Sequence, residues 1–343
     1  MMVGAAPQDG DSNQLCDWLE LAVLASRTQK ALLSSVNLGL EMEEDFEDED
    51  FIAQDEIRER RIQCVVAAID ERTKSMGASY PFEFDDTRGF LKLKENPSPG
   101  GYAYLFCLIV SNAAKDGLLH DNGPWKPDLK KARDLFQVCA TVASAGFVRG
   151  PAFSVGYPRP DHSKFLEKLH QIYPSYCDGR PHPVRPSWAN PNANDDEIDV
   201  VAFRHEPDGL HGSQYLVAQA ASGANYPDKS IKNAVGVFHQ TWFVQQPATP
   251  ATPGLLFPFV LRNPKDGEDH VSQQQIEGEH WRTISVMGVL LFRGRLARYI
   301  DVAVELAAED GIKPIERLGE LSKVAEWVAA YVPQLIEAVE ELA

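Results

Sequence analysis

Two neighbouring segments constrain the fold of this chain more than any other feature. Residues 198–203 read Ile-Asp-Val-Val-Ala-Phe, and residues 214–220 read Gln-Tyr-Leu-Val-Ala-Gln-Ala. Both are short, apolar and rich in β-branched or aromatic side chains, as buried strands are. The Pro, Asp and Gly residues at 207–212 predict that a long turn joins them into an antiparallel hairpin. A purely helical protein would lack this hairpin.

The segments around the hairpin predict helices and one more strand. A helix is expected at residues 129–145, and Asn225 is a typical N-cap for a helix that follows the hairpin. The apolar segment 255–261 predicts a third core strand, and helices at 281–308 and 315–342 are expected after it. The predicted fold class is therefore α/β (α+β), with a mixed sheet core flanked by helices.

The first third of the chain predicts an amino-terminal region that is mainly helical. A chain of 343 residues is longer than the usual domain of roughly 100–200 residues. We expect a disordered tail at 1–12, the helical region at 13–128, and an α/β domain with carboxyl-terminal helices at 129–343. Within the helical region, a short hairpin is expected at 80–93 and helices at 14–36, 54–76 and 102–114.

Charge is distributed unevenly along the chain. The net charge is −17, and residues 1–50 carry twelve acidic and two basic residues. Residues 120–190 carry six acidic and ten basic residues, a local charge of +4 with neutral histidines. The net charge argues against nonspecific nucleic-acid binding by the whole molecule, but the basic stretch could form either a binding surface or a solvated face. The acidic run at 41–50 predicts a solvated loop or the first turn of a helix.

Several function classes lack their usual signals in this sequence. The five cysteines are scattered, odd in number and without CxxC spacing, which predicts reduced thiols and a cytoplasmic protein. No segment approaches the roughly 18 apolar residues that cross a bilayer, and no basic-then-apolar leader begins the chain. The absence of P-loop, GxSxG and GxGxxG motifs leaves nucleotide hydrolysis, serine hydrolysis and dinucleotide binding without support.

Three residues around the predicted hairpin have the chemistry for metal-assisted phosphodiester cleavage. Asp199 on the first strand offers a carboxylate to a divalent cation such as Mg²⁺ or Mn²⁺, and Gln219 on the second offers a neutral amide oxygen. Lys229, on the following helix, could neutralise the phosphate or polarise the attacking water. Two of these residues also have a structural explanation, since Asp199 could be an ion-pair partner or a cap and Gln219 a satisfied buried amide.

The same residues carry a resemblance to a nuclease superfamily. The chain reads Asp199-Val-Val-Ala-Phe203 and then Ala218-Gln219-Ala-Ala-Ser-Gly223-Ala-Asn225-Tyr226-Pro-Asp-Lys229. With Phe153-Ser-Val-Gly156-Tyr-Pro158-Arg159 upstream, these motifs resemble the PD-(D/E)XK nuclease superfamily, and within it bacterial proteins linked to phage defence. The resemblance spans about residues 80–300. It implies a restriction-endonuclease-like core and a metal-dependent DNA endonuclease that acts in an anti-phage defence system.

The chain departs from this resemblance at a possible metal-ligand position. Relatives often carry a glutamate after Leu-Phe on the preceding helix, where this chain has Gln137. Asp134 lies one turn earlier and the acidic residues 195–197 lie just ahead of the strand, so compensation is possible. The possible accessory residues are Gln137, Asp134 and Asp196. With glutamine at both 137 and 219, the alternative is a noncatalytic nuclease-fold subunit that binds DNA or a partner ATPase or helicase.

The resemblance also implies partners. DNA is the expected substrate, with Arg149, Arg159 and Lys232 as candidate contacts to nucleic acid. Another protein subunit of a defence operon is expected to bind the chain, and a homo-oligomer is possible. No contact with a membrane is expected.

Overall fold

The computed structural model describes most of the chain. The described residues are 6–8, 10–38, 48–114, 117–119, 128–190, 195–206, 208, 210, 213–223, 225–226, 229, 231–261, 273–309 and 314–340. Residues 1–5 and 9 of the predicted tail and 41–47 of the acidic run lie outside them, as do residues 207, 209, 211 and 212 of the predicted turn.

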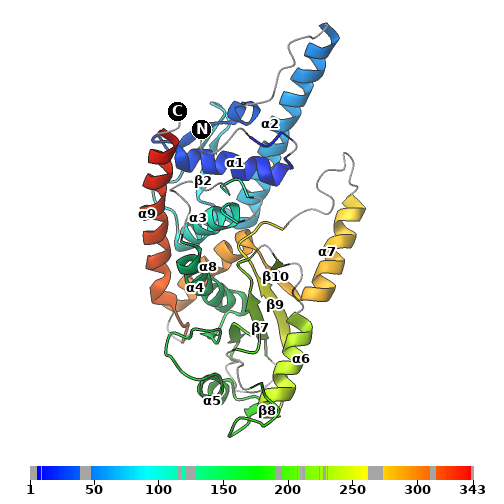
Figure 1. The fold of residues 1–343 in the computed structure, drawn as a ribbon, viewed down its shortest axis with the longest axis vertical. Helices are drawn as coiled ribbons and strands as arrows, with labels where there is room; N and C mark the ends of the chain where they lie inside the picture. Colours follow the sequence, from blue (N-terminus) through cyan, green and yellow to red (C-terminus); the bar gives the residue numbers. More distant parts are fainter. Residues whose placement is uncertain are drawn as a thin grey trace.

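A mixed sheet with the strand order β10-β9-β7-β6-β4 forms the centre of the fold (Figure 1). Neighbours among β4, β6 and β7 are antiparallel, whereas β7, β9 and β10 are parallel. The predicted hairpin is confirmed, because Val201 of β6 pairs with Val217 of β7. The strands are β4 (Ala152–Ser154), β6 (Val200–Phe203), β7 (Tyr215–Ala220), β9 (Thr252–Leu256) and β10 (Val289–Leu291).

Helices cover both faces of this sheet. Val200 and Ala202 of β6 pack into one hydrophobic layer, and Val201 and Phe203 pack into the other. The first layer contains α4 (Leu129–Val148) and α8 (Arg293–Ala308); the second contains α5 (Phe165–Tyr176) and α6 (Ile231–Trp242). Strands buried on both faces read as continuous apolar runs, as β6 does. The mixed α/β class with a helix-flanked sheet is thus confirmed.

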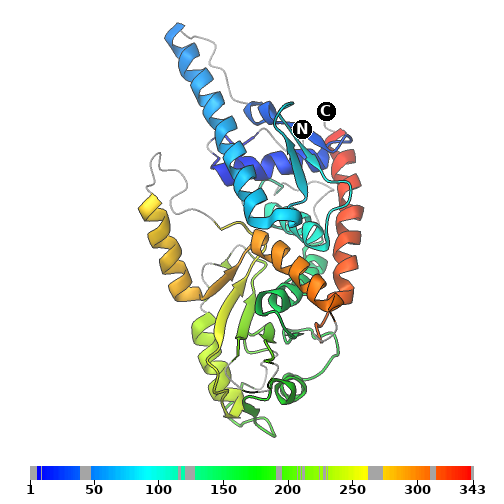
Figure 2. The same ribbon diagram turned by 180° about the vertical axis from the view of Figure 1, so that it is seen from behind.

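The amino-terminal region combines helices with a smaller antiparallel sheet of order β1-β3-β2. The expected hairpin at 80–93 is confirmed as β2 (Phe82–Asp85) and β3 (Phe90–Leu93). The helix expected at 14–36 is wrong in its second half, where β1 (Lys30–Leu32) pairs with β3 and η1 (Leu33–Asn37) follows. The helices here are α1 (Ser12–Ala25), α2 (Asp48–Met76), α3 (Pro99–Asn112) and the short η2 (Gly77–Ser79). α2 projects beyond the body of the molecule in both views (Figure 1, Figure 2).

One hydrophobic core runs across the expected boundary at residue 128. Buried side chains of α1 and α3 belong to the same cluster as those of α4 and α8, and α9 (Leu321–Glu340) contributes to it as well. Leu19, Leu105, Val142 and Ile300 are all fully or almost fully buried in this cluster. The amino-terminal helices and the mixed sheet are therefore parts of one packed unit.

The helix expected at 281–308 is interrupted. α7 (Gln273–Met287) ends just before Gly288, β10 then pairs with β9, and α8 begins at Arg293. Gly288 has φ +82°, and a Cβ there would lie 2.2 Å from the carbonyl oxygen of Pro253, so only glycine fits. None of the described helices is long and apolar enough to cross a membrane.

The segment before α9 covers the outer edge of β4. Ile315 forms a parallel bridge with Ala152, and the N–H of Ser154 donates to Oε2 of Glu316 at 2.9 Å. The buried ammonium of Lys168 donates to Oε1 of Glu316 at 2.6 Å, which fixes this segment against α5. The remaining short elements are β5 (Arg180–Pro181), β8 (Phe243–Gln245) and η4 (Leu318–Glu320).

Candidate functional site

The three residues of the predicted site lie at one edge of the mixed sheet. β4, β7, β9 and β10 end at this edge and β6 begins there, because β6 runs antiparallel to β4 and β7. Asp199 immediately precedes β6, Gln219 is near the end of β7, and Lys229 lies between β7 and α6. Ligands of α/β sheets commonly bind outside the carboxyl ends of the strands, so the topology brings these residues to a suitable place.

Backbone hydrogen bonds hold Asp199 at this edge. The N–H of Ala220 donates to Oδ2 of Asp199 at 2.8 Å. The N–H groups of Val155 and Gly156 donate to its carbonyl oxygen at 2.8 and 3.1 Å. A Cβ at Gly156 would lie 2.3 Å from Oδ1 of Asp199. The carboxylate can occupy its position only because residue 156 has no side chain.

The carboxyl group of Asp199 binds its proton unusually tightly. Burial raises its pKa from 3.8 to about 7; the N–H of Ala220 opposes this rise, the negative charge of Asp195 adds to it, and the positive charge of Lys229 lowers the pKa. Desolvation is the largest cause, and a desolvated carboxylate is stabilised by a cation or by a proton. Perturbed carboxyl groups of this kind cluster at functional sites.

Asp195 is a second carboxylate close to Asp199. Its Oδ2 accepts from the N–H of Tyr157 at 3.2 Å, and its Oδ1 accepts from the N–H of Glu197 at 3.3 Å. Its charge acts on Asp199. Among the acidic residues 195–197, the sequence predicts Asp196 as the accessory ligand, but the charge that acts on Asp199 is that of Asp195. No local sequence signal separates these neighbours.

The predicted accessory residues have other partners. Oδ2 of Asp196 accepts from Nε1 of Trp242 at 2.7 Å. Oδ1 of the exposed Asp134 accepts from Nη2 of Arg317 at 3.0 Å. Gln137 does reach Asp199, but its Nε2 donates to the backbone carbonyl oxygen of that residue at 2.9 Å. Gln137 therefore supports the backbone behind the carboxylate.

Gln219 is a buried amide that has no hydrogen-bond partner in the part of the chain that the structure describes. Its side chain is 7% exposed. Gln219 and Asp199 each lie one residue beyond the paired residues Ala218 and Val200, so they are neighbours on adjacent strands. An amide oxygen is a ligand that hard cations accept. Gln219 can therefore offer an amide oxygen at this sheet edge.

Lys229 lies near Asp199, but not within the helix that the sequence predicts for it. α6 begins at Ile231, so Lys229 precedes the helix. Its backbone N–H donates to the carbonyl oxygen of Tyr226 at 3.2 Å. The side chain is half-buried, and its charge lowers the pKa of Asp199, so the ammonium and the carboxylate interact.

The three candidate contacts to nucleic acid do not share one surface. Arg159 is 6% exposed, and its guanidinium donates to two backbone carbonyl oxygens at 2.7 Å each, so it holds a loop together. Arg149 is exposed at the end of α4, where β4 begins, and this is the sheet edge opposite Asp199. Lys232 is exposed on the same side as Asp199, in the first turn of α6, and donates to a backbone carbonyl of α7.

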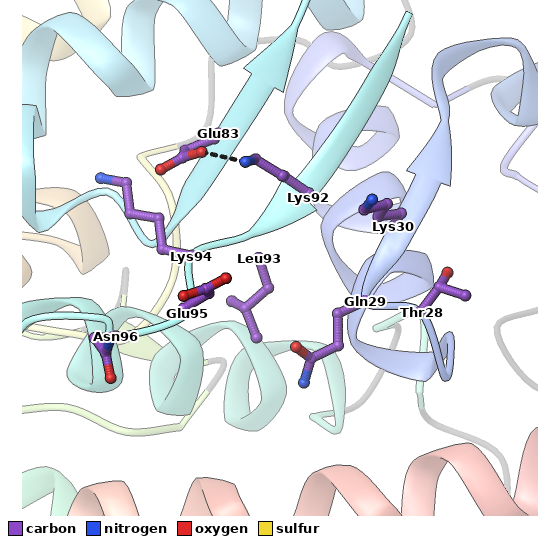
Figure 3. A pocket seen from close by; sticks show the side chains of 9 residues that line it. All are labelled: Thr28, Gln29, Lys30, Glu83, Lys92, Leu93, Lys94, Glu95 and Asn96. Carbon is purple, nitrogen blue, oxygen red and sulfur yellow. Dashed lines mark ion pairs between the residues drawn. The ribbon is translucent and has the colours of Figure 1, made fainter. Parts of the chain in front are cut away.

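A polar cavity of about 510 Å³ lies away from this edge, against the β1-β3-β2 sheet (Figure 3). Lys92 is directly opposite Lys30 in that sheet and forms an ion pair with Glu83 at 2.7 Å. Lys94 and Glu95 complete its charged lining. The charges are mixed, and none of the predicted site residues lines this cavity.

The oxygen atoms at the sheet edge come from few acidic residues. Among the described residues, no group of three or more His, Cys, Asp or Glu side chains is arranged to hold a metal ion. The candidate ligands are two carboxylates, Asp199 and Asp195, and the amide of Gln219. Comparisons with protein-family models, with curated proteins and with solved structures find no match to this chain. The fold is mixed α/β, and its function has to be argued from the site.

Proposed function

We propose that this protein is a metal-dependent DNA nuclease of the PD-(D/E)XK type. It would work in the bacterial cytoplasm as one component of an anti-phage defence system, together with another protein subunit. The observation that supports this proposal is that Asp199, Gln219 and Lys229 lie on neighbouring elements at one sheet edge, where the charge of Lys229 acts on Asp199. The chain order also supports it: helix α4, a strand next to an acid, a strand with a polar residue near its end, and then a lysine.

A divalent cation that prefers oxygen ligands fits the candidate site. The carboxylate of Asp199 and the amide oxygen of Gln219 would hold it, and Asp195 would add a second negative charge. Because one ligand is neutral, weak binding of Mg²⁺ or Mn²⁺ is expected. When bound, the cation supplies positive charge to the phosphate and lowers the pKa of an attacking water.

The side chains would divide the remaining work between them. The ammonium of Lys229 would neutralise negative charge that develops on the phosphate, an electrostatic role that depends on a fixed position. The N–H of Ala220 orients the carboxylate of Asp199, and Gly156 leaves room for it. Burial at this edge strengthens each of these interactions, because the local dielectric is lower than that of water.

Cleavage of duplex DNA by the purified protein in Mn²⁺ tests the proposal. Lys229→Ala is expected to reduce the cleavage rate by on the order of 10²–10³, with little change in melting temperature. Lys92→Ala is the matched control, because this lysine lines the polar cavity away from the site and should be dispensable for cleavage. A Lys229→Ala variant that cleaves at the wild-type rate would refute the assignment.

The glutamines at 137 and 219 favour a second function, in which the nuclease fold is noncatalytic. The chain would then bind DNA or a partner ATPase or helicase without cutting. A thermal-shift titration separates the two functions. Mn²⁺ should raise the melting temperature of a nuclease, and Asp199→Asn should abolish that rise. DNA binding without any Mn²⁺ effect would indicate the noncatalytic subunit.

A further inference from the structure

Two buried cations and two buried anions form a cluster beneath α1. Arg293, Arg72, Asp17 and Glu20 are each less than 8% exposed. Arg293 binds Asp17 with both arms of its guanidinium, at 2.8 and 2.9 Å. Arg72 lies 2.8 Å from both Asp17 and Glu20. Burial opposes ionisation of Asp17, but Arg293 and then Arg72 lower its pKa to about 2, so this carboxylate stays charged.

Arg293 extends from this cluster to the segment that follows β9. Its Nε donates to the carbonyl oxygen of Pro258 at 3.2 Å, and its backbone N–H donates to that of Phe259 at 3.1 Å. Its Nη2 also donates to Oγ of Ser111 on α3 at 2.7 Å. One side chain therefore joins α1 and α3 to the sheet edge at which β9 ends. Lysine could not make this set of contacts, because it lacks the planar fork of donors.

The segment after β9 supports the connection that contains Lys229. Phe257 stacks on Tyr226 with ring centroids 4.3 Å apart and an angle of 9° between the rings. Phe259 stacks on the same tyrosine at 5.3 Å and 20°. Tyr226 is 9% exposed, and its carbonyl oxygen accepts from the N–H of Lys229. Stacked aromatic pairs contribute roughly 0.5–1.5 kcal/mol beyond burial, enough to favour one placement of this connection.

We propose that Arg293 is a positioning residue for the candidate site. Through Pro258 and Phe259 it fixes the aromatic stack under Tyr226, and so holds Lys229 beside Asp199. The amino-terminal helix α1 supports the site indirectly, because Asp17 orients the guanidinium of Arg293. The catalytic meaning of this arrangement rests on the proposed nuclease function, whereas the positioning itself does not.

A spectroscopic signal from Tyr226 tests the positioning without any need for activity. Protein labelled with 3-fluorotyrosine gives a fluorine NMR signal for Tyr226, assigned by its loss in Tyr226→Phe. Arg293→Met keeps the backbone hydrogen bond to Phe259 but loses the one from the guanidinium to Pro258, and it is expected to shift this signal. Glu20→Gln is the matched control, since it perturbs the same cluster through Arg72 without touching Arg293. This control should lower stability and leave the signal in place.

A second variant covers the case in which Arg293→Met does not fold. Arg293→Lys keeps the charge and loses the planar fork of donors, and it should shift the Tyr226 signal. If the wild type cleaves DNA, both variants should lower kcat by on the order of 10-fold to 10²-fold with little change in KM, as misplacement of a catalytic group does. An unmoved Tyr226 signal in a folded variant overturns the inference. A shifted signal in a protein that never cleaves DNA overturns only the proposed function.

Discussion

Replacing Asp199 by asparagine should make the protein more stable at alkaline pH, although it removes a predicted metal ligand. Burial raises the pKa of Asp199 from 3.8 to about 7, so the folded protein binds this proton more tightly than the unfolded chain does. The stabilising contribution of this carboxyl group is complete below about pH 4, and it is lost as the pH rises through about 7. The ionised group therefore destabilises the fold at high pH.

The size of the effect follows from the two pKa values. The difference between 3.8 and about 7 corresponds to roughly 4 kcal/mol, at about 1.36 kcal/mol per unit. Roughly 2 kcal/mol of this is lost between about pH 5.5 and about pH 8.5. Asp199→Asn keeps an acceptor for the N–H of Ala220 and carries no charge, so it escapes this loss. The unfolding free energy of the variant relative to wild type should thus rise by about 2 kcal/mol over that range.

Urea unfolding at the two pH values, without divalent cations, measures this difference. Asp161→Asn is the control. Burial raises the pKa of Asp161, but hydrogen bonds from Ser163 and Lys168 outweigh it and lower the pKa to about 2. Asp161 therefore stays ionised across the whole range, and the effect of its replacement should not change with pH. A pH-independent difference for Asp199→Asn would show that its carboxyl group is not desolvated.

Three further substitutions test the packing of the mixed sheet and the helices that flank it. Gly156→Ala should lower the unfolding free energy by roughly 1–3 kcal/mol and weaken Mn²⁺ binding, because the new methyl group would lie 2.3 Å from Oδ1 of Asp199. Gly236→Ala on α6 is the control: a Cβ there meets nothing within 4 Å, so it should raise the unfolding free energy by roughly 0.5–1 kcal/mol. Thermal unfolding compares the two variants. Lys168→Met should lower the unfolding free energy by roughly 3 kcal/mol at neutral pH, because Glu316 at 2.6 Å and Asp161 at 2.9 Å lose their cation. An unchanged urea midpoint would contradict this. Tyr215→Phe should lower the unfolding free energy by roughly 1–2 kcal/mol, since the hydroxyl of Tyr215 is hydrogen-bonded to Tyr173 and to His239. Calorimetry measures this, and an unchanged unfolding free energy would show that these bonds are absent.

The central hairpin could be predicted because its signal is local. A run such as Val200–Phe203 is apolar on both faces, and the turn residues that follow set the direction of the chain. β4 and β10 could not be found in the same way. Each has three residues, too few for a periodic pattern, and β10 exists because it pairs with β9, a contact that is distant in sequence.

The candidate site was predictable only in part. The order of the motifs places Asp199, Gln219 and Lys229, but it does not show which neighbouring acid joins them. The backbone at Asp196 and Glu197 is left-handed, with φ of 52° and 66°, a rare conformation for residues other than glycine. No local pattern predicts this pair of conformations. The burial of Arg159 is likewise decided by loop contacts that its own sequence neighbourhood does not reveal.

Segments from the last sixty residues of the chain lie at both outer sides of the mixed sheet. β10 occupies one flank, and residues 314–316 cover the free side of β4 on the other. The hairpin of β6 and β7 precedes both of these segments in the chain. Exposed strand edges invite pairing with other chains. Loss of either late segment would therefore expose a strand edge of the sheet, so truncation of residues 314–340 is expected to uncover β4.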